Sequence, residues 1–554
     1  MKKLYLMVLL NGLVFSICAQ NFSWAKREGL WAYDYGYGIV NDNAGNVYVA
    51  GKYEENAVFS GTTLTSAGNH DMFLAKYSSA GAVDWIRTAG GNLGDYAHAL
   101  AIDASNNLYA AGEIEGYGNT ISFPGSPVNI TCVGDNDAFV AKYDMNGTLL
   151  WAKSEGWKYS EKALAVTCDY LGNVYIAGYY TDTTMFDGIQ LISKGGRDLY
   201  IAKYSPSGGF VWMQSAGSAG RDEALSIKCD PAGDVYVCGM HSDGAVFGTT
   251  TLSTGPTSYP DYDIFLAKYN SSGVMQWVKS PGSDYDDIAW SMTIDNAGTI
   301  FITGEYNAYA VFDGFALTTS GDADIFVASY DASGTVLWVK SAGGPVIDRA
   351  RGIGCDGTNL YITGQYGSDT LGAPAMFNTF SLTAADSSDV FIAALNSSGD
   401  FLWATAVSGP ADSVETLGYE SGNAVCAEAT GSIYATGAVL DGGVFGSTTF
   451  SEYARTDVFV AKLTQAGVAV PENASSGRVK FFPNPTTGKV TLDISYISGS
   501  ADVVNIYNYL GQLVLSQSDV SNNSEFDLSS YNKGIYFIET ICGQNNSRAK
   551  IVLQ

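Results

Sequence analysis

The chain has 554 residues, of which 46% are hydrophobic and 15% charged, a composition of a folded globular protein and not of a disordered one. Its formal net charge of −27 argues against nucleic acid as a partner, because phosphates demand Lys and Arg, and against an anionic membrane surface. Cations and neutral molecules are the compatible ligands, and we expect a monomer.

The sequence opens with MKKLYLMVLLNGLVFSICAQ, in which Lys2 and Lys3 precede a short apolar run and then small residues. This pattern predicts a secretory signal peptide over residues 1–19, with cleavage after Ala19. No later stretch has about 18 uninterrupted apolar residues, so the sequence predicts no transmembrane segment.

Residues 20–463 contain a repeated segment, of which DMFLAKYSSAGAVDW is the first copy. A second motif, GNVYVAG in its first form, precedes every copy. A repeat of about 64 residues predicts a repeat architecture. The copies begin at Asp71, Asp137, Asp198, Asp263, Asp324, Asp389 and Asp457.

Each unit has the pattern of four short strands. Two of the links are short and rich in Asp, Asn and Gly, which is typical of hairpin turns, and the second and third strands are apolar nearly throughout. Four antiparallel strands in each of seven units predict an all-β fold, a seven-bladed β-propeller of four-stranded antiparallel blades.

The two ends of the repeat region complement each other. Six copies lead into a strand with Trp, the copy at Asp457 does not, and Trp24 belongs to a strand with no unit before it. A propeller has to close, or it leaves an exposed edge strand. We therefore expect the N-terminal strand to close the ring as the outer strand of the last blade.

An acidic residue stands eight positions before the acidic turn of every unit. Because this position precedes the innermost strand, we expect seven carboxylates around the mouth of the central channel. They would form a cation site, with Ca²⁺ as the possible cofactor, or accept backbone N–H bonds and fix their own loops. The residues are Asp34, Asp95, Glu161, Asp222, Asp287, Asp348 and Glu420.

The long connections should mark the binding face. Alternate connections of a four-stranded blade lie at the same end, so the long second-to-third and fourth-to-first connections should share one face. We expect the variable loops 115–134, 253–262 and 408–423 to open there, together with Tyr residues outside the repeat positions, and a glycan or a surface protein to bind there.

The histidines and cysteines suggest no catalytic or metal centre. None of the three histidines stands in a metal-binding motif, and we expect His70 and His241 in solvated loops. Cys168, Cys229 and Cys355 occupy the same place in different units, which we do not expect to bring them together, so we interpret them as small buried side chains.

The repeated motifs resemble a family of secreted bacterial β-propeller repeats with units of the form D-x-F-x-A-K, S-G, W and then Y-x-x-G. The resemblance covers residues 21–463 and weakens in the last two units, where IAALN and AKLT replace the Lys-Tyr pair. This family is defined by its fold, so the resemblance implies no activity.

The composition changes after the repeats. Residues 464–477 are small, polar and contain Pro, which predicts a linker, and the short alternating strands of residues 478–554 predict a small β-sandwich. The segments FFPNPTTGKVTL, IYNYLGQLV, DLSSYNKGIYFIE and KIVLQ are similar to the type A C-terminal sorting domain of type IX secretion substrates. The motif positions are Pro483, Asn484, Pro485, Gly488, Gly511, Gly534, Tyr536 and Lys550.

The second resemblance implies export across the outer membrane of a Gram-negative bacterium by the type IX machinery, removal of the C-terminal domain, and release or anchoring at the cell surface. The sequence as a whole predicts a secreted or surface-anchored binding or adhesion module with an unknown ligand. A polysaccharide hydrolase or lyase and a purely structural surface protein are the alternatives. We assign no catalytic residue, because no unit stands out with acidic or basic residues that the others lack.

Overall fold

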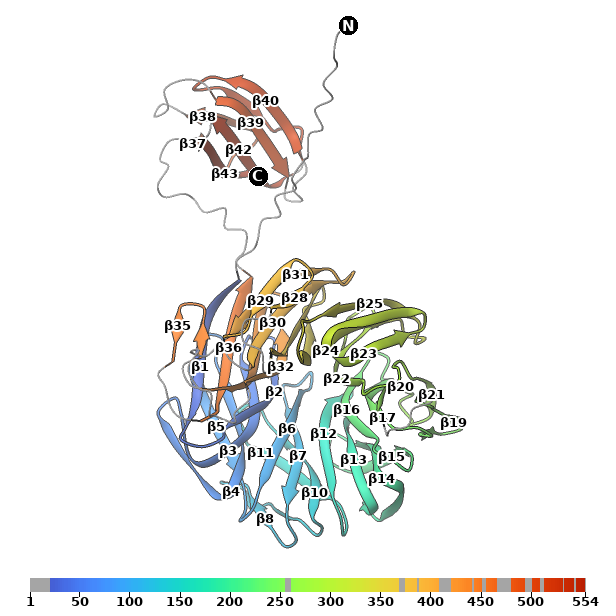
Figure 1. Ribbon diagram of the computed structural model, residues 1–554. Coiled ribbons are helices and arrows are strands. Elements are labelled where there is room, and N and C mark those ends of the chain that lie inside the picture. Colours follow the sequence, from blue (N-terminus) through green and yellow to red (C-terminus); the bar gives the residue numbers. More distant parts are fainter. Residues whose placement is uncertain are drawn as a thin grey trace. The chain divides into compact units, whose positions relative to one another are not determined.

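The computed structural model describes residues 20–254, 261–367, 374–385, 388–407, 420–440, 443–450, 455–465, 480–493, 501–508, 513–531, 533–542 and 545–553. The chain divides into two compact units, Met1–Gln465 and Ala466–Gln554 (Figure 1). The predicted signal peptide and nearly all of the predicted linker lie outside the described residues. Over the described ranges the regular structure is β-strand. No helix in these ranges is long and apolar enough to cross a membrane.

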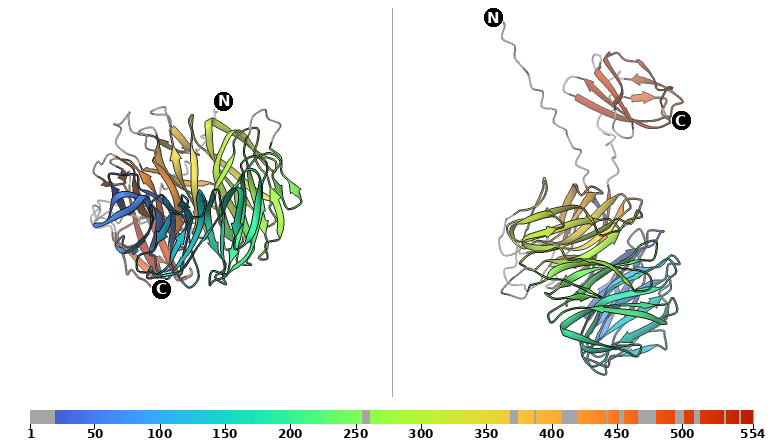
Figure 2. Two further views of the ribbon diagram at one scale, coloured as in Figure 1. Left: turned by 90° about the horizontal axis from the view of Figure 1, so that it is seen from below. Right: turned by 90° about the vertical axis from the view of Figure 1, so that its right-hand side faces the viewer.

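The first unit consists of antiparallel groups of four strands. Five groups are separate four-stranded sheets, and two further groups join through β1 and β3 into an eight-stranded sheet (Figures 1 and 2). Consecutive strands of a group are neighbours, as short hairpin turns require. The prediction of an all-β fold with four-stranded antiparallel sheets is therefore confirmed.

The strands fall into four sets according to their place in each group. The first strands are β2 (Tyr35–Asn41), β6 (Asp95–Ile102), β12 (Glu161–Cys168), β16 (Glu223–Cys229), β22 (Ile288–Ile294), β26 (Arg349–Cys355) and β32 (Ser421–Ala427). The second strands are β3 (Val47–Phe59), β7 (Leu108–Glu115), β13 (Val174–Phe186), β17 (Val235–His241), β23 (Ile300–Phe312), β27 (Asn359–Tyr366) and β33 (Ser432–Val439). The third strands are β4 (Thr62–Tyr77), β10 (Asn136–Tyr143), β14 (Ile189–Tyr204), β20 (Asp263–Tyr269), β24 (Phe315–Tyr330), β30 (Asp389–Asn396) and β36 (Asp457–Gln465). The fourth strands are β5 (Val83–Ala89), β11 (Leu149–Glu155), β15 (Phe210–Ala216), β21 (Met275–Lys279), β25 (Val336–Ala342), β31 (Phe401–Val407) and β1 (Gln20–Leu30).

The second-to-third connection, which looks merely variable in the sequence, forms a further hairpin in each group. In three groups it extends the second and third strands, as in β13 and β14. In the others it is a separate ladder. These ladders pair β8 (Thr120–Ser122) with β9 (Asn129–Thr131), β18 (Val246–Phe247) with β19 (Thr250–Thr251), β28 (Pro374–Phe377) with β29 (Phe380–Thr383), and β34 (Val444–Phe445) with β35 (Thr448–Thr449).

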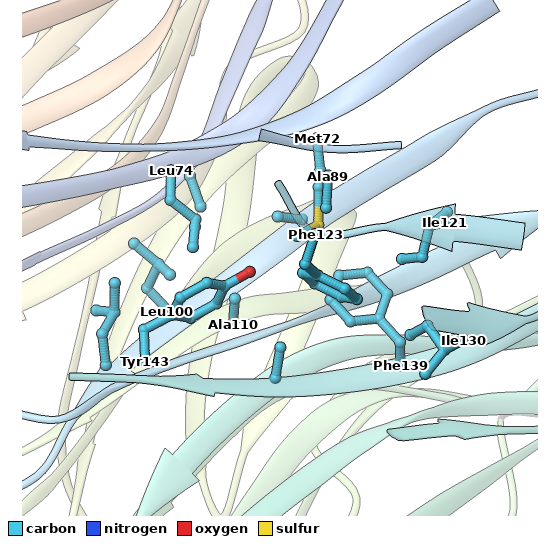
Figure 3. Close-up of a cluster of buried hydrophobic side chains, with 14 of the residues drawn as sticks. Met72, Leu74, Ala89, Leu100, Ala110, Ile121, Phe123, Ile130, Phe139 and Tyr143 are labelled. Atoms are coloured by element: carbon cyan, nitrogen blue, oxygen red, sulfur yellow. The ribbon is translucent and has the colours of Figure 1, made fainter. Parts of the chain in front are cut away.

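A buried Phe of this hairpin packs on the aromatic ring of the Asp-led motif. The ring centroids are 4.7 Å apart for Phe59 and Phe73, and 5.1 Å apart for Phe312 and Phe326. Figure 3 shows the corresponding cluster around Phe123, with Met72 of the neighbouring group next to it. The hairpin therefore completes the apolar core between adjacent groups.

The Trp of the fourth strand binds to the next group. The indole N–H of Trp212 donates to the backbone oxygen of Ser271 at 3.2 Å, and Trp151 makes the same bond to Pro206 at 3.2 Å. The glycine of that turn lies against the indole at a positive φ, +81° at Gly273, where a Cβ would come within 2.9 Å of the Trp212 ring. The S-G and W motifs are thus two halves of one contact between groups.

The first strands contact one another in a cyclic order, in which β2 contacts both β6 and β32. The N-terminal strand β1 pairs antiparallel with β36, with Trp24 opposite Lys462. The Trp24 indole donates to the backbone oxygen of Ser79 in the first group at 3.1 Å. Strand β1 is therefore the fourth strand of the group that contains β36, and its Trp makes the usual contact with the group that follows.

The second unit contains two sheets around a separate apolar core. One pairs β37 (Lys480–Phe482), β38 (Lys489–Asp493) and β41 (Glu525–Asp527), and the other pairs β40 (Leu513–Val520), β39 (Ala501–Asn508), β42 (Gly534–Cys542) and β43 (Asn545–Leu553). Side chains of both sheets, including Val490, Ile506 and Ile551, form the buried cluster.

The predicted sorting motif lies along the contact between the two ends of this unit. Pro483 and Pro485 flank Asn484, whose side-chain oxygen accepts a hydrogen bond from the backbone N–H of Val552 at 3.0 Å. A Cβ on Gly488 would lie 2.2 Å from the Ser529 hydroxyl oxygen, so only glycine fits. Gly534 begins β42, which also contains the buried Tyr536; Gly511 and the side chain of Lys550 are outside the described residues.

We expect Trp24→Ala to lower the free energy of unfolding of the first unit by about 3 kcal/mol, near the lower end for a large aromatic side chain because Trp24 is only partly buried. Urea denaturation measures the change. As a control, replacing the exposed Trp157 by Ala should change the stability by less than about 1 kcal/mol. Equal, small effects of both substitutions would contradict a stabilising role for β1.

Candidate functional site

The seven acidic residues selected from the sequence stand before or at the start of the first strands, and all of their side chains are fully buried. Five accept a hydrogen bond from a backbone N–H in the second-to-third connection of their own group; for Asp222 the donor is Ser242 at 3.0 Å, and for Asp287 it is Asn307 at 3.0 Å. Asp222 also accepts from the N–H of Ser218 at 2.7 Å, in the connection from the preceding group. These carboxylates therefore join two connections to the start of a first strand.

Each of the first six acids is also close to the Asp that opens the repeated motif of the adjacent group. The pair Glu161 and Asp137 shows the geometry: a Cβ on the intervening Gly156 would lie 2.5 Å from Asp137 Oδ1 and 2.7 Å from Glu161 Oε2. Burial, followed by the neighbouring acids, raises the pKa of Glu161 to about 8. Burial likewise raises the pKa of Asp34 and Asp95 to about 8. Such pairs retain protons near neutral pH.

The acids do not gather into one cluster. Among the residues that the structure describes, no three His, Cys, Asp or Glu side chains lie close enough together to hold a metal ion. Asp34, Asp95 and Asp348 each accept a hydrogen bond from a backbone N–H. The role of the seven acids stays a prediction.

Three residues after each of these acids, a β-bulge interrupts the first strand and directs a side chain into the centre of the unit. The residues at this position surround a cavity of about 200 Å³ that all seven first strands line. In chain order they are Tyr37, His98, Leu164, Leu225, Trp290, Arg351 and Asn423. No two neighbours of this ring are alike except the leucines, although the residues that follow the bulge are uniformly small.

An aromatic cluster lies where the first strands begin. Tyr35 and Tyr37 stack with ring centroids 5.9 Å apart, and Tyr96 stacks on His98 at 5.4 Å. The ammonium group of Lys52 lies 5.3 Å from the Tyr35 ring and 5.6 Å from the Tyr96 ring, which is cation–π geometry. We call these five side chains the mouth cluster.

Three glutamates on the same side of the cavity hold cations. Glu113 pairs with Lys162 at 2.7 Å and contacts His98 at 3.1 Å. Burial alone would raise the pKa of Glu113, but His98 and Lys162 outweigh it and hold the pKa at about 2. Glu223 pairs with Arg197 and Arg221, each at 2.5 Å, and Glu305 pairs with Arg349 and accepts from the Trp290 indole.

Two further cations line the cavity without such partners. Arg351 lies over the Trp290 ring, 5.1 Å from its centroid, and its Nε is buried without a hydrogen bond. Lys228 lies farther along the channel, where the thiols of Cys168, Cys229, Cys355 and Cys426 affect its pKa. Burial lowers the pKa of both cations.

The expectation that different units keep the cysteines apart is therefore wrong. The first strands converge, and the cysteines at their ends come together around Lys228. The described cysteines are all free, and burial raises the pKa of Cys168 to about 12, so these thiols are packing groups.

The expectation of solvated loop histidines is also wrong. His241 is buried at the end of β17, with Nε2 2.7 Å from the Ser280 hydroxyl. His70 lies in β4 against Tyr96, with centroids 4.4 Å apart. Burial lowers the pKa of both histidines to about 4. Of the tyrosines outside the repeat positions, Tyr117 and Tyr285 are exposed on connections, and Tyr259 and Tyr419 lie outside the described residues.

The bulge residues, and Arg351 in particular, were not predicted from the sequence. Their signal is present, since the third residue after each predicted acid differs among units that otherwise agree. Arg351 is an odd basic residue of the kind that would distinguish one unit from the others, but it stands inside the first strand instead of in a loop.

Residues 480–554 match the family described as the secretion system C-terminal sorting domain. The second unit is therefore a sorting domain of type IX secretion, and the protein is exported to the cell surface or the extracellular space.

Similarity elsewhere is distant. A WD repeat-containing protein of Acanthamoeba polyphaga mimivirus is 27% identical over 232 residues, which cover 36% of this chain and 17% of that protein. The regulatory protein FlaEY of Caulobacter vibrioides is 23% identical over 181 residues, which cover 32% and 19%. The chain thus spans less than a fifth of the length of either relative.

Two solved structures are similar at low identity. Sqt1 from Chaetomium thermophilum is 10% identical, with a TM-score of 0.37 over 80% of this chain and 100% of its own. The extracellular domain of a hybrid two-component system from B. thetaiotaomicron is 9% identical, with a TM-score of 0.20 over 96% and 100%.

The buried acids predict that the first unit loses stability as the pH rises from 6.5 to 9. Their folded pKa values are raised above those of the unfolded chain, so the folded state holds more protons, and this stabilisation is lost as the pH passes through about 8. The pKa values of His70 and His241 are lowered in the folded state, so these two residues make the unit more stable as the pH rises. Their effect is confined to the range below about pH 6.5. Thermal melts across this range measure the effect.

Glu161→Gln should reduce this loss, because the amide keeps the shape of the side chain and cannot ionise. Glu55→Gln changes an exposed glutamate and should leave the pH profile as in the wild type. A melting temperature that is constant or rises between pH 6.5 and 9 would contradict the carboxyl pairs. A melting temperature that rises with calcium would instead support the cation site considered from the sequence.

Proposed function

We propose that the first unit is a seven-bladed β-propeller closed by β1, and that it serves as a secreted binding module. The cyclic contacts among the first strands, the pairing of β1 with β36, and the repeated Trp contact between groups support this architecture. With β1 in place every group has its fourth strand, and a propeller leaves only short, protected sheet edges, which suits a protein that works outside the cell.

The observation that carries the binding proposal is the mouth cluster together with the ring behind it. Chemically different side chains occupy one structural position in all groups, whereas packing alone would favour similar ones. The connections before the first strands add exposed aromatic residues at the same end: Trp157 is 47% and Tyr285 54% exposed. Exposed aromatic rings on connections held by a rigid scaffold are suited to recognition.

Binding is favoured over polysaccharide cleavage because of how the glutamates are used. A glycosidase needs a carboxylic acid and a second carboxylate free to act on the substrate. At the mouth, Glu113, Glu223 and Glu305 are each held by cations. The predicted ligands of this face remain a glycan or a surface protein.

We expect Tyr96→Ala to weaken binding of the secreted protein to glycan or cell-surface arrays by about tenfold, because one to two kcal/mol is typical for an aromatic contact at a binding surface. Tyr170→Ala is the matched control, since Tyr170 is 67% exposed in the short turn at the other end of β12. Equal binding by both variants would place recognition away from the mouth cluster.

Deleting residues 480–554 should leave the protein inside the producing bacterium, because these residues form the sorting domain. Cell fractionation and immunodetection measure the location. The same segment fused to a periplasmic reporter should carry the reporter to the surface or the medium. Export of the truncated protein at the wild-type level would contradict this role.

A further inference from the structure

The cavity contains two positive charges that nothing else in the described part of the chain neutralises. Arg351 forms no hydrogen bond or ion pair with a described residue, and the carboxylate that most affects it, Glu305, is paired with Arg349. Lys228 likewise has no ion pair with a described residue. In a chain with a net charge of −27, acidic partners are abundant, yet the described lining of the cavity holds none against these two cations.

Arg351 and Lys228 are only partly exposed to solvent. A cation that loses part of its hydration without gaining a partner destabilises a fold, so a ligand is a direct physical reason for it to be present. The planar guanidinium of Arg351 offers parallel N–H donors that match the two oxygens of a carboxylate. Trp290 lies against this guanidinium, with Arg351 Cζ 5.1 Å from the ring centroid. No described residue forms an ion pair with the guanidinium, so its N–H groups can bind a ligand.

The spacing of the two cations favours a carboxylate over a phosphate. Arg351 stands three residues, and Lys228 six residues, after the acid of its group, so they lie at levels roughly 10 Å apart along the channel at 3.3 Å per residue. They therefore do not converge on one doubly charged group. Of the two cations, only Arg351 lies at the level of the seven bulge residues. A ligand at that level therefore needs only one negative charge.

The other walls limit the size and nature of the ligand. At about 30 Å³ per water molecule, a cavity of about 200 Å³ holds roughly six or seven waters, enough for one small group and not for an oligomer. Tyr37 and Trp290 present aromatic rings, which suit the faces of a sugar, and Leu164 and Leu225 form an apolar wall.

We propose that the cavity binds one carboxylate-bearing, sugar-sized unit, such as a uronic acid, with its carboxylate on the guanidinium of Arg351 and its ring between the aromatic and leucine walls. The unit is either a free sugar acid or the end of an acidic polysaccharide that enters past the mouth cluster. This inference deepens the proposed function by naming a ligand class, and it rests on that function only for the entry route.

Calorimetric titration of the secreted protein at low salt tests the proposal, with sodium glucuronate as the probe. Glucose and the methyl ester of glucuronic acid, which lack the charge, should bind at least about tenfold more weakly, and acetate should bind weakly because it lacks the ring. Binding should weaken as salt is added. An oligomer that ends in glucuronate separates the two sources: tighter binding than the monomer indicates a polysaccharide end, and equal or weaker binding a free acid.

Arg351→Gln should reduce the affinity for glucuronate by at least about tenfold, and Lys228→Met by less, because Lys228 lies deeper. Arg87→Gln is the matched control: Arg87 lies on the fourth strand β5, bonded to backbone oxygens, and its loss should leave the affinity unchanged. If Arg351→Gln does not fold, Arg351→Lys tests the same point, since it keeps the charge and loses the paired donors, and it should bind with intermediate affinity.

The proposal is overturned if glucuronate binds no better than glucose at about 20 mM, if Arg351→Gln keeps the wild-type affinity, or if inorganic phosphate binds and glucuronate does not. Failure of this inference is distinct from failure of the proposed function. If Tyr96→Ala loses binding to the arrays and the wild-type protein does not bind glucuronate, the recognition face is retained and the cavity ligand is rejected. If the wild-type protein binds glucuronate and Tyr96→Ala still binds the arrays, the cavity ligand is retained and the recognition face is rejected.

Discussion

The buried carboxylate at the start of each first strand is the interaction on which the unit depends. Asp222 shows why: it accepts N–H bonds from Ser218, in the connection from the preceding group, and from Ser242, in the hairpin connection of its own group. One side chain thus fixes where the first strand begins and how adjacent groups meet. Because the strand always starts at the same place, the bulge that follows always directs its residue into the same cavity.

In this arrangement the residues that stabilise the fold are different from those that line the cavity. The acid, the small residue after the bulge, the turn glycine and the Trp are needed in every group, since each contacts a neighbouring group. The bulge residue lines the cavity in every group, and its type varies: it is Tyr37 in one group, Leu164 in another and Arg351 in a third, on the same kind of sheet. A binding site can therefore change while the sheets stay the same.

The same separation explains how much the sequence could predict. The strand pattern and the place of Trp24 follow from motifs that recur with a fixed period, and the sheets confirm the four-stranded antiparallel arrangement. The positions of His70, partly buried against Tyr96, and of His241, fully buried, could not be predicted, because these residues stand where the repeats vary. The meeting of Cys168 and Cys229 was missed for a geometric reason: equal positions in different units are far apart in sequence and close together where the strands converge.

The hairpin of the second-to-third connection and the bulge residues were missed for a different reason. Phe59 and Phe312 lie in a stretch whose length and polar residues vary, so their recurrence is obscured although both are fully buried. The bulge shifts the alternation of inward and outward side chains by one residue, and a reading with period two then assigns Arg351 to the wrong face. A bulge leaves little local sequence signature except small neighbours, such as Gly352.

The mouth and the cavity differ in how their positive charges are compensated. At the mouth, Lys162 and Arg349 are each paired with a glutamate, and Arg197 and Arg221 share Glu223, so most of the positive charge there is compensated. The strongly negative protein would, at long range, repel an acidic ligand, and salt outside the cell screens that repulsion beyond roughly 10 Å. Within that distance the charge of Arg351 acts on a ligand in the cavity, because no described acidic side chain lines the cavity beside it. On the binding function proposed above, selection for charge would therefore take place inside the ring, after a ligand has passed the aromatic surface of the mouth cluster.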